Sequence, residues 1–577
     1  MQLSYVKSSV EARQHAAELA NQPVLGVDIE TTGLDPLTNR VRLLAAATLS
    51  GRIVVFDMFH VSWDSLQPIC GVGWVCHNAS FEWRHLTYAG LTVPPLHDSM
   101  LLDRLVSHHN RKLDEVAADH LGLSLDKTLQ VSNWSAPDLR SEQIEYCGAD
   151  ALATVRIAQE LLPQVDKAGQ RRLYDLWRQA IPMLAGLTLR GQSFDWDTHS
   201  NLIDKWTAEK KTLTQQLQQH LGGINYNSGP QIGDWLKDNL PAATLKTWPK
   251  TASGRLSTAA DTLELHAKQP MIQPLLRYKA VQKLLSTYGL GWQKNRHPVT
   301  GNLHPEFSLG MTVSGRLACS KPNTQNPPRL TEFRQLFVPP PGQVLIGADF
   351  SQIELRVAAL LSGDWNMLDA YRKGEDLHTK TAAAIAGCAV EAVTVEQRQG
   401  AKPVNFGNLY GQAAAGLARQ ANLDYGVGMT TADATQALLK FKLAYPQLEH
   451  WKRQQLGLAQ QQRQVKTKLG LVRDFDRQHE GYLRGEAQNM PVQGSAAEVL
   501  LASLVRLPAA LAGTDAVLYH TVHDEIELAC SPGFADRVAA ELRGVMMQGF
   551  LDVFPEGEAL THKLVDVKAG SSWAELK

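Results

Sequence analysis

Apolar and polar positions in the first part of the chain follow the pattern of a sheet. Three mainly apolar runs, VLGVDIE, LLAAATLS and RIVVFD, succeed one another, and Ser50-Gly51 marks a turn between the second and the third. Helical periodicity follows from about Ser141, and Pro163 opens a polar stretch that indicates a boundary. We therefore expect a first α/β domain with a mixed sheet over residues 1–165.

The remainder of the chain has a different pattern. Residues from about 196 to 290 are dominated by polar amphipathic helices, which indicates an arm. A buried-strand run, QVLIGADF, follows a proline-rich segment, and an alanine-rich helical segment fills about 365–460. Near the C-terminus, AVLYHTVHDEIELA predicts two strands that meet at His523-Asp524.

Composition narrows the protein class. At 577 residues and 63.6 kDa the chain is too long for one core, so three or more lobes are expected. The net charge of -1 gives no bulk attraction to nucleic acid, so any DNA-binding surface must arise by segregating charge. There is no apolar run near the ~20 residues that span a bilayer, and we expect a cytoplasmic protein without membrane contact. The six cysteines form no CxxC pair, so reduced thiols are expected rather than a zinc site or disulfides.

A first group of acids stands out near the N-terminus. Asp28 and Glu30 are two apart on a predicted strand, so both carboxylates project from one face. A divalent cation would relieve their repulsion, and hard oxygen ligands suit magnesium or manganese. Tyr146 and Asp150 are four apart on a predicted helix and share a face. The alternative is a solvated strand edge and an ordinary helix face.

The segments DIETTGLDP, HNASFE and YCGAD, in this order and spacing, resemble the DnaQ-like 3′ to 5′ exonucleases. The resemblance covers roughly residues 20–165. It implies that Asp28, Glu30 and Asp150 bind two metal ions and that Tyr146 orients the attacking water toward the terminal phosphodiester.

One position departs from that family's pattern. HNASFE supplies Glu82 where the family usually has aspartate, and the longer side chain can displace or reorient the second metal ion. Because glutamate keeps the charge, we expect the activity to be retained. Asn78 and His77 are explained equally well by capping or packing and by substrate contact, and Asp98 is expected to be a helix N-cap.

A second group of acids lies in the C-terminal two thirds of the chain. Asp349 ends an apolar strand, an unusual place for a charge that does not face a cation or a cleft. Asp524 and Glu525 stand at the expected bend of a hairpin. If these elements are neighbours, the two aspartates can hold a metal pair about 4 Å apart, which suits phosphoryl transfer.

Between these acids, Arg398, Lys402, Phe406 and Tyr410 recur every four residues. On a helix they form one stripe ~18 Å long, with two cations followed by two aromatic rings. Such a stripe can grip a triphosphate and flank a base and sugar. The alternative is an amphipathic helix with solvated cations and buried rings.

DFSQIELR, RQGAKPVNFGNLYG and VHDE lie in the order found in family A DNA polymerases, and TVSGRLACSKPNTQNPP, EDLHTKTAA and QNMPVQGSAAE support the resemblance. It covers most of residues 180–577. The implied fold is an α/β exonuclease domain with an RNase H-like mixed sheet, followed by an α+β right-hand polymerase domain over residues 166–577. We expect the thumb at about 180–300, the palm at about 301–365 and 460–577, and the fingers at about 366–459.

The resemblance also implies roles for individual residues. Asp349 and Asp524 would bind two magnesium ions, with manganese as an alternative, and Glu525 would support them. The nucleotide contacts would come from Glu354, which blocks a 2′ hydroxyl, and from His378, Arg398, Lys402, Phe406 and Tyr410. Contacts with the primer-template would come from Arg316, Asn489, Gln493 and His523, for which ordinary structural hydrogen bonding is the alternative.

Two residues depart from the expected polymerase pattern. Pro403 lies inside the nucleotide helix and is expected to bend or loosen it next to Lys402. Gly485 stands where the family commonly has arginine, and the neighbouring Arg484 is a candidate substitute. Either departure can alter rate or fidelity.

The sequence therefore predicts a DNA polymerase with a proofreading exonuclease, whose partners are primer-template DNA and deoxynucleoside triphosphates. Its processivity factor or helicase is not indicated. A single-subunit RNA polymerase is a rival, which Glu354 and the first acid cluster disfavour. A non-catalytic DNA-binding accessory is another, which the presence of Asp349 and Asp524 disfavours.

Overall fold

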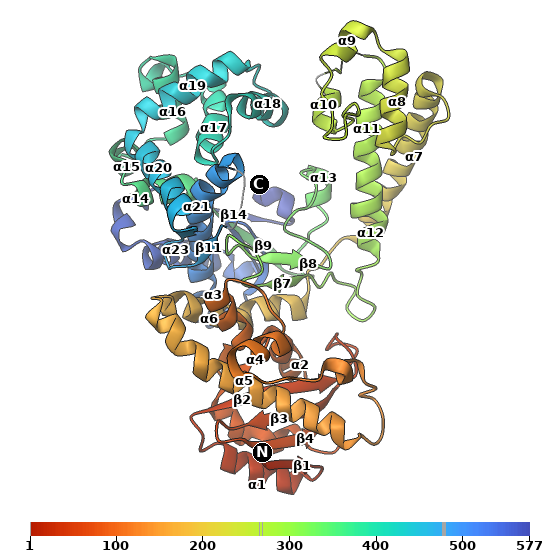
Figure 1. Ribbon diagram of the computed structural model, residues 1–577, viewed down its shortest axis with the longest axis vertical. Helices are drawn as coiled ribbons and strands as arrows, with labels where there is room; N and C mark the ends of the chain where they lie inside the picture. The colour runs from red at the N-terminus through yellow and green to blue at the C-terminus, as the bar shows by residue number, and fades with distance from the viewer. Residues whose placement is uncertain (1, 265, 268, 476–479) are drawn as a thin grey trace.

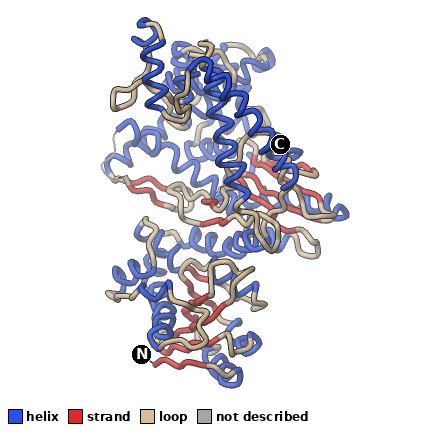
Figure 2. The backbone as a smooth tube through the Cα atoms, turned by 90° about the vertical axis from the view of Figure 1, so that its right-hand side faces the viewer, coloured by secondary structure: helices blue, strands red, loops and turns tan. Residues whose placement is uncertain are grey.

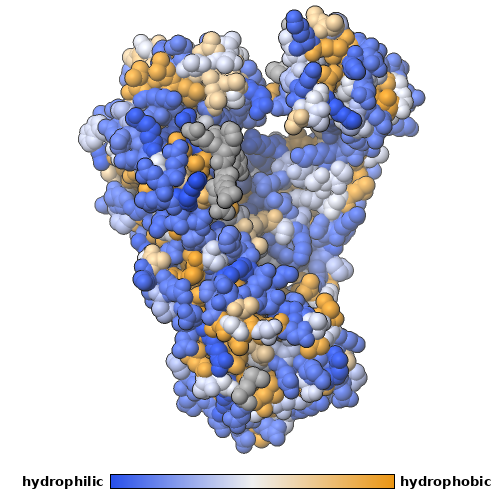
Figure 3. All heavy atoms as spheres, in the orientation of Figure 1, coloured by the Kyte–Doolittle hydropathy of each residue, from blue (hydrophilic) through white to orange (hydrophobic). Residues whose placement is uncertain are grey.

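The computed structural model describes residues 2–264, 266–267, 269–475 and 480–577. The molecule is elongated, with the N-terminal part at one end (Figure 1). At the other end a yellow-green helical lobe and a cyan helical lobe stand on either side of a hollow that is visible in Figure 3. The strands fall into separate groups, one in the N-terminal part and others in the middle of the molecule (Figure 2).

The N-terminal domain is built on a six-stranded sheet in the order β1-β4-β3-β2-β5-β6. The sheet is mixed, because β3 runs antiparallel to β2 and β4 while the other neighbours are parallel. Its strands are β1 (Gln2–Val6), β2 (Val24–Thr31), β3 (Val41–Ala47), β4 (Arg52–Asp57), β5 (Gly73–Cys76) and β6 (Leu96–Asp98). Its helices are α1 (Ser9–Leu19), η1 (Trp63–Gly71), α2 (Ser80–Tyr88), α3 (Ser99–Ser107), α4 (Leu113–Leu121), η2 (Lys127–Val131) and α5 (Ser141–Lys167). The predicted α/β fold is confirmed.

The contact of α5 with β2 positions the first acid cluster. All seven residues of β3 are buried, as an apolar strand covered by a helix requires. A Cβ atom at Gly26 would lie 2.0 Å from the carbonyl oxygen of Ala151, so only glycine permits this close approach. The helix passes through Pro163 and ends at Lys167, beyond the boundary that the pattern predicts.

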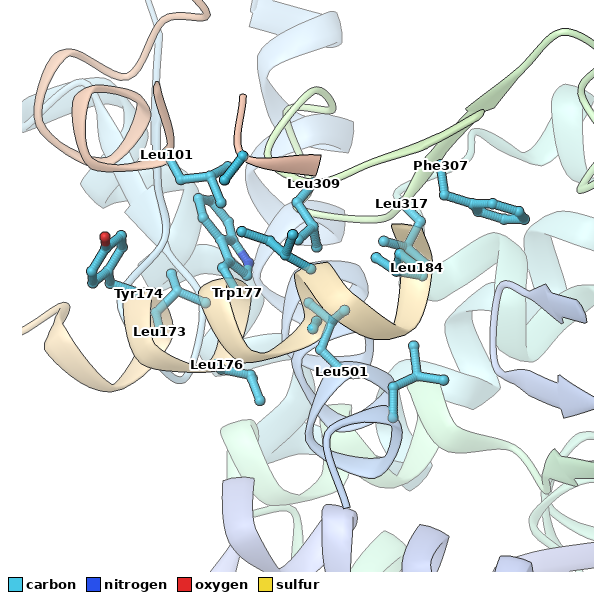
Figure 4. Close-up of a cluster of buried hydrophobic side chains, with 14 of the residues drawn as sticks. Leu101, Leu173, Tyr174, Leu176, Trp177, Leu184, Phe307, Leu309, Leu317 and Leu501 are labelled. Carbon is cyan, nitrogen blue, oxygen red and sulfur yellow. The ribbon is translucent and has the colours of Figure 1, made fainter. Parts of the chain in front are cut away.

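Helix α6 (Arg171–Arg190) joins the N-terminal domain to the rest of the chain. Trp177 and Leu184 of α6 pack in one apolar cluster with Leu101 of α3, Leu309 and Leu501 (Figure 4). The Nε atom of Arg104 donates a 2.9 Å hydrogen bond to the carbonyl oxygen of Gly310 at the same junction. The two parts of the chain therefore share a continuous core.

The yellow-green lobe is the predicted thumb. Its helices are α7 (Trp196–Leu221), α8 (Gly229–Asn239), α9 (Ala242–Lys246), α10 (Ala260–Glu264), α11 (Ile272–Lys283), the π-helix η3 (Leu284–Gly289) and α12 (Leu290–Gln293). α7 packs along α11 (Figure 1). The core of this lobe includes Trp206 and Trp292 and reaches Phe333 and Trp573 beneath the thumb.

The predicted palm contains a four-stranded antiparallel sheet in the order β12-β13-β9-β14. Its strands are β9 (Val344–Phe350), β12 (Val517–Val522), β13 (Glu525–Cys530) and β14 (Val565–Gly570). Two short hairpins lie outside this sheet. One pairs β7 (Glu306–Ser308) with β8 (Ala318–Ser320), and the other pairs β10 (Gln464–Lys466) with β11 (Val472–Asp474). Helices of this part are α13 (Thr331–Arg334), α14 (Ile353–Ser362), α21 (Glu480–Leu504), α22 (Leu507–Ala510), η5 (Pro532–Phe534), α23 (Ala535–Val553), η6 (Pro555–Leu560) and η7 (Trp573–Leu576). The two strands expected to meet at His523-Asp524 are confirmed as β12 and β13.

The cyan lobe is the predicted fingers and is wholly helical. It consists of α15 (Trp365–Arg372), α16 (Leu377–Ala386), η4 (Val390–Ala392), α17 (Val395–Leu409), α18 (Ala414–Tyr425), α19 (Thr431–Ala444) and α20 (Pro446–Gln461). Pro403 does not interrupt α17, which packs on α16 and α18. Within the described ranges, no helix is long and apolar enough to cross a membrane.

Candidate active sites

A cavity of about 640 Å³ in the N-terminal domain contains the first acid cluster. Its lining includes all five residues predicted for this site, namely Asp28, Glu30, Glu82, Tyr146 and Asp150. β2 supplies the first two, the first turn of α2 supplies Glu82, and α5 supplies the last two. The structure therefore brings the three predicted segments to one place.

Burial and mutual repulsion raise the pKa values of the acids in this cavity. Burial, followed by the charge of Asp150, raises the pKa of Asp28 well above its usual range. Burial and then the charge of Asp28 raise the pKa of Glu30 to about 10. Burial and then the charge of Asp28 also raise the pKa of Glu82. Carboxyls in this state gain most from a cation, because it removes both the repulsion and the cost of desolvation.

The donor atoms of the cavity fit a divalent metal ion. Oδ1 of Asp150 and Oε2 of Glu82 are buried and have no hydrogen-bond partner among the described residues. Buried polar oxygens without a partner are rare and indicate a missing water or ion. Asp28, Glu30, Asp150 and Glu82 supply the hard oxygen ligands that magnesium and manganese prefer.

The sequence did not single out Lys127, which lies among these acids. Its Nζ atom donates hydrogen bonds to Oδ2 of Asp150 at 2.6 Å and to the Tyr146 hydroxyl at 3.2 Å. Its position on η2 follows the capping residue Asp126. A lone lysine in a polar loop carries no local signal of such a contact, so only the fold reveals it.

Asp98 fixes the start of two helices near the cavity. Its side chain accepts hydrogen bonds from the amides of Met100 and Leu101, which confirms the predicted N-cap of α3. It also accepts a 2.8 Å bond from the amide of Ala79, one turn before Glu82. Asn78 adopts a left-handed backbone with φ of 70°, and the Nδ1 atom of His77 lies 3.0 Å from Oγ of Ser99. Asp98 therefore positions the helix that carries Glu82.

A second cavity, of about 410 Å³, lies in the palm. Six of the predicted residues line it: Arg316, Asp349, Glu354, Phe406, His523 and Asp524. β13 pairs with β9 so that Glu525 lies opposite Asp349. The amide of Phe350 donates a 3.2 Å hydrogen bond to the carbonyl oxygen of Asp524. The pairing therefore places the C-terminal end of β9 against the bend between β12 and β13.

The two aspartates of the palm affect each other. Removal from water is the main cause that raises the pKa of Asp349 to about 6. Burial, then the charge of Asp349, then that of Glu354 raise the pKa of Asp524 to about 7. Two acids that resist ionisation beside one another fit a divalent cation, as in the first cavity.

Comparison with known proteins identifies the two parts of the chain. A family model described as 3′-5′ exonuclease matches residues 3–166, and the model of DNA polymerase family A matches residues 197–575. The chain belongs to DNA polymerase family A. Its N-terminal part is a 3′-5′ exonuclease domain, and the predicted combination of the two is confirmed.

Several relatives of this family A polymerase are DNA polymerases I. The protein of Aquifex aeolicus is 28% identical over 562 residues, which cover 93% of this chain and 94% of the relative. That of Pseudomonas aeruginosa is 31% identical over 514 residues, covering 84% and 54%, so this chain spans about half of its length. The POL domain of Pol1 from M. smegmatis, solved in complex with DNA primer-template and dNTP, is 24% identical with a TM-score of 0.86, and both chains are covered completely. This similarity confirms the predicted right-hand fold.

Glu525 of this family A polymerase does not line the palm cavity. Its carboxylate is buried and accepts hydrogen bonds from Nε1 of Trp573, at 3.3 Å, and from the ammonium group of Lys577. Burial raises the pKa of Asp349, and the positive charge of Lys577 offsets part of that rise. The sequence did not single out Trp573 or Lys577, since neither is near the acids along the chain.

Glu354 organises the nucleotide side of the palm cavity. It lies in the first turn of α14 and accepts hydrogen bonds from the Tyr410 hydroxyl and from the guanidinium group of Arg316. The rings of Phe406 and Tyr410 stack with centroids 6.2 Å apart. Through these contacts, the nucleotide-binding candidates Glu354, Tyr410 and Phe406 form one connected group with Arg316, a candidate for DNA binding.

The remaining residues predicted for nucleotide binding lie on the fingers, outside the lining of the cavity. Arg398 binds the carboxylate of Asp376, the N-cap of α16. Nδ1 of His378 lies 2.6 Å from Nδ2 of Asn405, and burial lowers the pKa of His378 to about 4. Lys402 lies on α17, one turn from Arg398. Asp376 was missed because capping alone explains its position in the sequence.

The residues predicted to contact the primer-template are divided between two cavities. Arg316 and His523 line the palm cavity, whereas Asn489 and Gln493 of α21 line a neighbouring cavity of about 380 Å³ together with Tyr410. Gly485 also lines this neighbouring cavity. The cation there is Arg473, which pairs with Glu486. Arg484, the substitute that the sequence suggested, is exposed and is not among the lining residues.

Proposed function

We propose that the palm cavity adds deoxynucleotides to a primer 3′ end, as directed by a template and with release of pyrophosphate, and that the exonuclease cavity removes mispaired ends. The observation that carries this proposal is the hydrogen bond between Phe350 and Asp524, which holds Asp349 and Asp524 at one cavity. Two neighbouring carboxylates that resist ionisation are suited to a pair of divalent ions.

In the palm, Asp349 and Asp524 would hold the ions, with magnesium as the natural choice and manganese as the alternative. Such ions supply activation of a primer hydroxyl and neutralisation of phosphate charge when they are bound. Glu525 keeps β13 in place through Trp573 and Lys577.

The nucleotide is bound by residues of the fingers and of α14. Arg398, Lys402 and His378 bind the triphosphate, and Arg398 exchanges Asp376 for phosphate oxygens when it does so. Glu354 meets the 2′ position of the sugar and excludes a hydroxyl group there. Phe406 packs beside the sugar, and Tyr410 stacks at the insertion position.

The primer-template is bound beside this nucleotide site. Arg316, Asn489, Gln493 and His523 contact the minor groove or the primer end, where acceptors of all base pairs are similar. The M. smegmatis POL domain was solved with a primer-template and a dNTP bound, which supports the same partners here. A processivity factor or helicase is not identified.

In the exonuclease domain, Asp28, Glu30 and Asp150 would hold the ions, and Glu82 completes the group of acids. Tyr146 orients the water that attacks the terminal phosphodiester, and Lys127 fixes the Tyr146 hydroxyl by its 3.2 Å hydrogen bond. We place the boundary of this domain near residue 165, which the limits of the two family matches support. We also propose a cytoplasmic location, on the basis of the DNA polymerase I relatives.

Primer extension and degradation of a labelled primer test the proposal together. We expect Asp349→Asn to lose extension and keep degradation, and Asp28→Asn to show the reverse, because each variant removes a carboxylate from one cavity alone. Extension that survives in the first variant, or degradation that survives in the second, contradicts the corresponding half of the proposal.

A further inference from the structure

A loop of the exonuclease domain forms one wall of its cavity and reaches the polymerase domain. Residues 31–34, here called the cavity wall, directly follow Glu30 and line the cavity. Oδ2 of the next residue, Asp35, lies 2.8 Å from Nε2 of His297. His297 belongs to the loop between α12 and β7, which descends from the base of the thumb toward the N-terminal domain (Figure 1). The cavity wall is therefore attached to the polymerase domain.

Asp35 organises the turn that follows the cavity wall. Its Oδ1 atom accepts a 3.0 Å hydrogen bond from the amide of Leu37, and its Oδ2 atom accepts one of 2.9 Å from the Thr38 hydroxyl. Its carbonyl oxygen accepts a 2.9 Å bond from the amide of Asn39. Aspartate side chains commonly fix turns in this way. A side chain that holds Asp35 therefore also holds the wall next to it.

The hydrogen-bonding pattern of His297 directs a ring hydrogen at Asp35. The amides of Val299 and Thr300 each lie 3.2 Å from Nδ1 of His297. A backbone amide can only donate, so Nδ1 is the acceptor and Nε2 carries the hydrogen. Nε2 therefore donates to the carboxylate of Asp35. The side chain of His297 is only 10% exposed, so water competes little for this bond.

A second histidine of the same loop region offers a matched control. The ring of His304 lies beside that of His297, with centroids 4.7 Å apart. Its Nδ1 atom lies 2.8 Å from the carbonyl oxygen of Thr188, and its Nε2 atom lies 2.7 Å from the Thr300 hydroxyl. Both of these partners belong to the polymerase domain. Replacing His304 therefore disturbs the loop and leaves the hydrogen bond to Asp35 in place.

We propose that His297 is a positioning residue for the exonuclease, because its hydrogen bond to Asp35 holds the cavity wall against the end of a primer strand. The inference rests on the proposed exonuclease function of this cavity. The wall lies beside the acids of the cavity rather than among them, so loss of the bond should raise KM for the primer end more than it lowers kcat. The palm cavity has a separate lining, so primer extension should not depend on this bond.

Two substitutions of His297 separate its two hydrogen bonds. The side-chain oxygen of His297→Asn can take the place of Nδ1 and keep the amides of its own loop, but this side chain is too short to reach Asp35. The amide nitrogen of His297→Gln can take the place of Nε2 and keep the bond to Asp35. A positioning role therefore predicts that the glutamine variant behaves like the wild type and that the asparagine variant does not.

Hydrogen exchange followed by mass spectrometry tests the positioning on the full chain without a substrate. We expect peptides over residues 31–40 to exchange faster in His297→Asn than in the wild type, while His297→Gln and His304→Leu exchange like the wild type. Unchanged exchange in β3 shows that the domain remains folded. The proposal is overturned by wild-type exchange over residues 31–40 in His297→Asn, or by equally fast exchange in His304→Leu.

Degradation of a labelled single strand and primer extension, both in magnesium, test the consequence. We expect His297→Asn to raise KM for degradation by about tenfold with a smaller change in kcat. His297→Gln and His304→Leu should keep the wild-type KM, and extension should be equal in all four proteins. A wild-type KM in His297→Asn overturns the proposal. If the wild type degrades no strand, the proposed exonuclease function fails, and the exchange of residues 31–40 still decides whether His297 holds the wall.

Discussion

Phe350 donates its backbone amide to the carbonyl oxygen of Asp524 across 3.2 Å, and this bond joins the end of β9 to the bend before β13. Asp349 precedes Phe350, so the two polymerase aspartates are held together by the backbone rather than by their own side chains. The carboxyl groups therefore stay available for ligands.

The raised pKa values of these aspartates predict a pH-dependent effect of magnesium on stability. Asp349 has a pKa of about 6 and Asp524 of about 7, against 3.8 for an ordinary aspartate. Between the ordinary and the raised pKa values, the folded state therefore binds more protons than the unfolded state. The free energy of unfolding falls as the pH rises through this range. Magnesium relieves the repulsion only once the acids are ionised. We expect a larger rise in Tm on adding magnesium at about pH 8 than at about pH 5, measured by calorimetry.

Asp524→Asn is the control for that measurement, because the exonuclease acids also respond to magnesium. The magnesium-induced rise in Tm should differ less between about pH 8 and about pH 5 in this variant than in the wild type. If this pH dependence is equally large in both proteins, the palm acids contribute nothing to it.

Substitutions that neutralise or shorten Glu82 test whether the exonuclease is fully active. Its buried carboxyl has one oxygen without a partner in the described chain, so it can reach a metal ion directly or through water. We expect Glu82→Gln to lower the rate of primer degradation by about 10–100-fold, and Glu82→Asp to keep most of the native rate. A large gain in Glu82→Asp would mean instead that native editing is weak.

Lys127 should matter for the exonuclease and not for the polymerase. Its contacts at 2.6 Å with Asp150 and 3.2 Å with Tyr146 hold both groups in place. We expect Lys127→Met to lower degradation by about 10²-fold and Lys127→Arg to restore part of it, with primer extension unchanged. Lys112→Met, which removes another lysine lining the cavity, controls for the loss of charge. Equal rates in Lys127→Met and wild type would limit Lys127 to a structural role.

Glu354 should control the choice of sugar. It is buried and bound to Tyr410 and Arg316, so its carboxylate is held in one position. We expect Glu354→Ala to lower the preference for deoxynucleotides over ribonucleotides by about tenfold or more, measured as a ratio of kcat/KM values. Glu354→Gln keeps the size of the side chain and should retain more of the preference. Wild-type use of ribonucleotides equal to that of deoxynucleotides would instead favour the RNA polymerase alternative.

Local periodicity predicted much of both sites. Asp28 and Glu30 share a face because strand residues alternate, and Tyr146 and Asp150 because helix residues recur after four positions. Strand patterning also predicted the β12-β13 bend, and motif order supplied the rest of the prediction.

The contacts of two lysines with distant acids could not be predicted. Lys127 and Lys577 approach acids that are far away in the sequence, and nothing next to either lysine indicates the contact. Pro163 was expected to close a helix and Pro403 to bend or loosen one, and α5 and α17 continue through these prolines. A proline costs one backbone hydrogen bond, and the packing of these helices on their neighbours outweighs that loss.

The central claim is that Asp349 and Asp524 hold one pair of divalent ions. Manganese bound to the chain can be counted by electron paramagnetic resonance, with primer-template and a non-hydrolysable nucleotide present and with the exonuclease acids removed by Asp28→Asn and Asp150→Asn. We predict two ions with the magnetic coupling of a pair about 3.5–4 Å apart, and loss of the coupled pair in Asp524→Asn. Two uncoupled ions, or a pair that persists in that variant, would contradict the account.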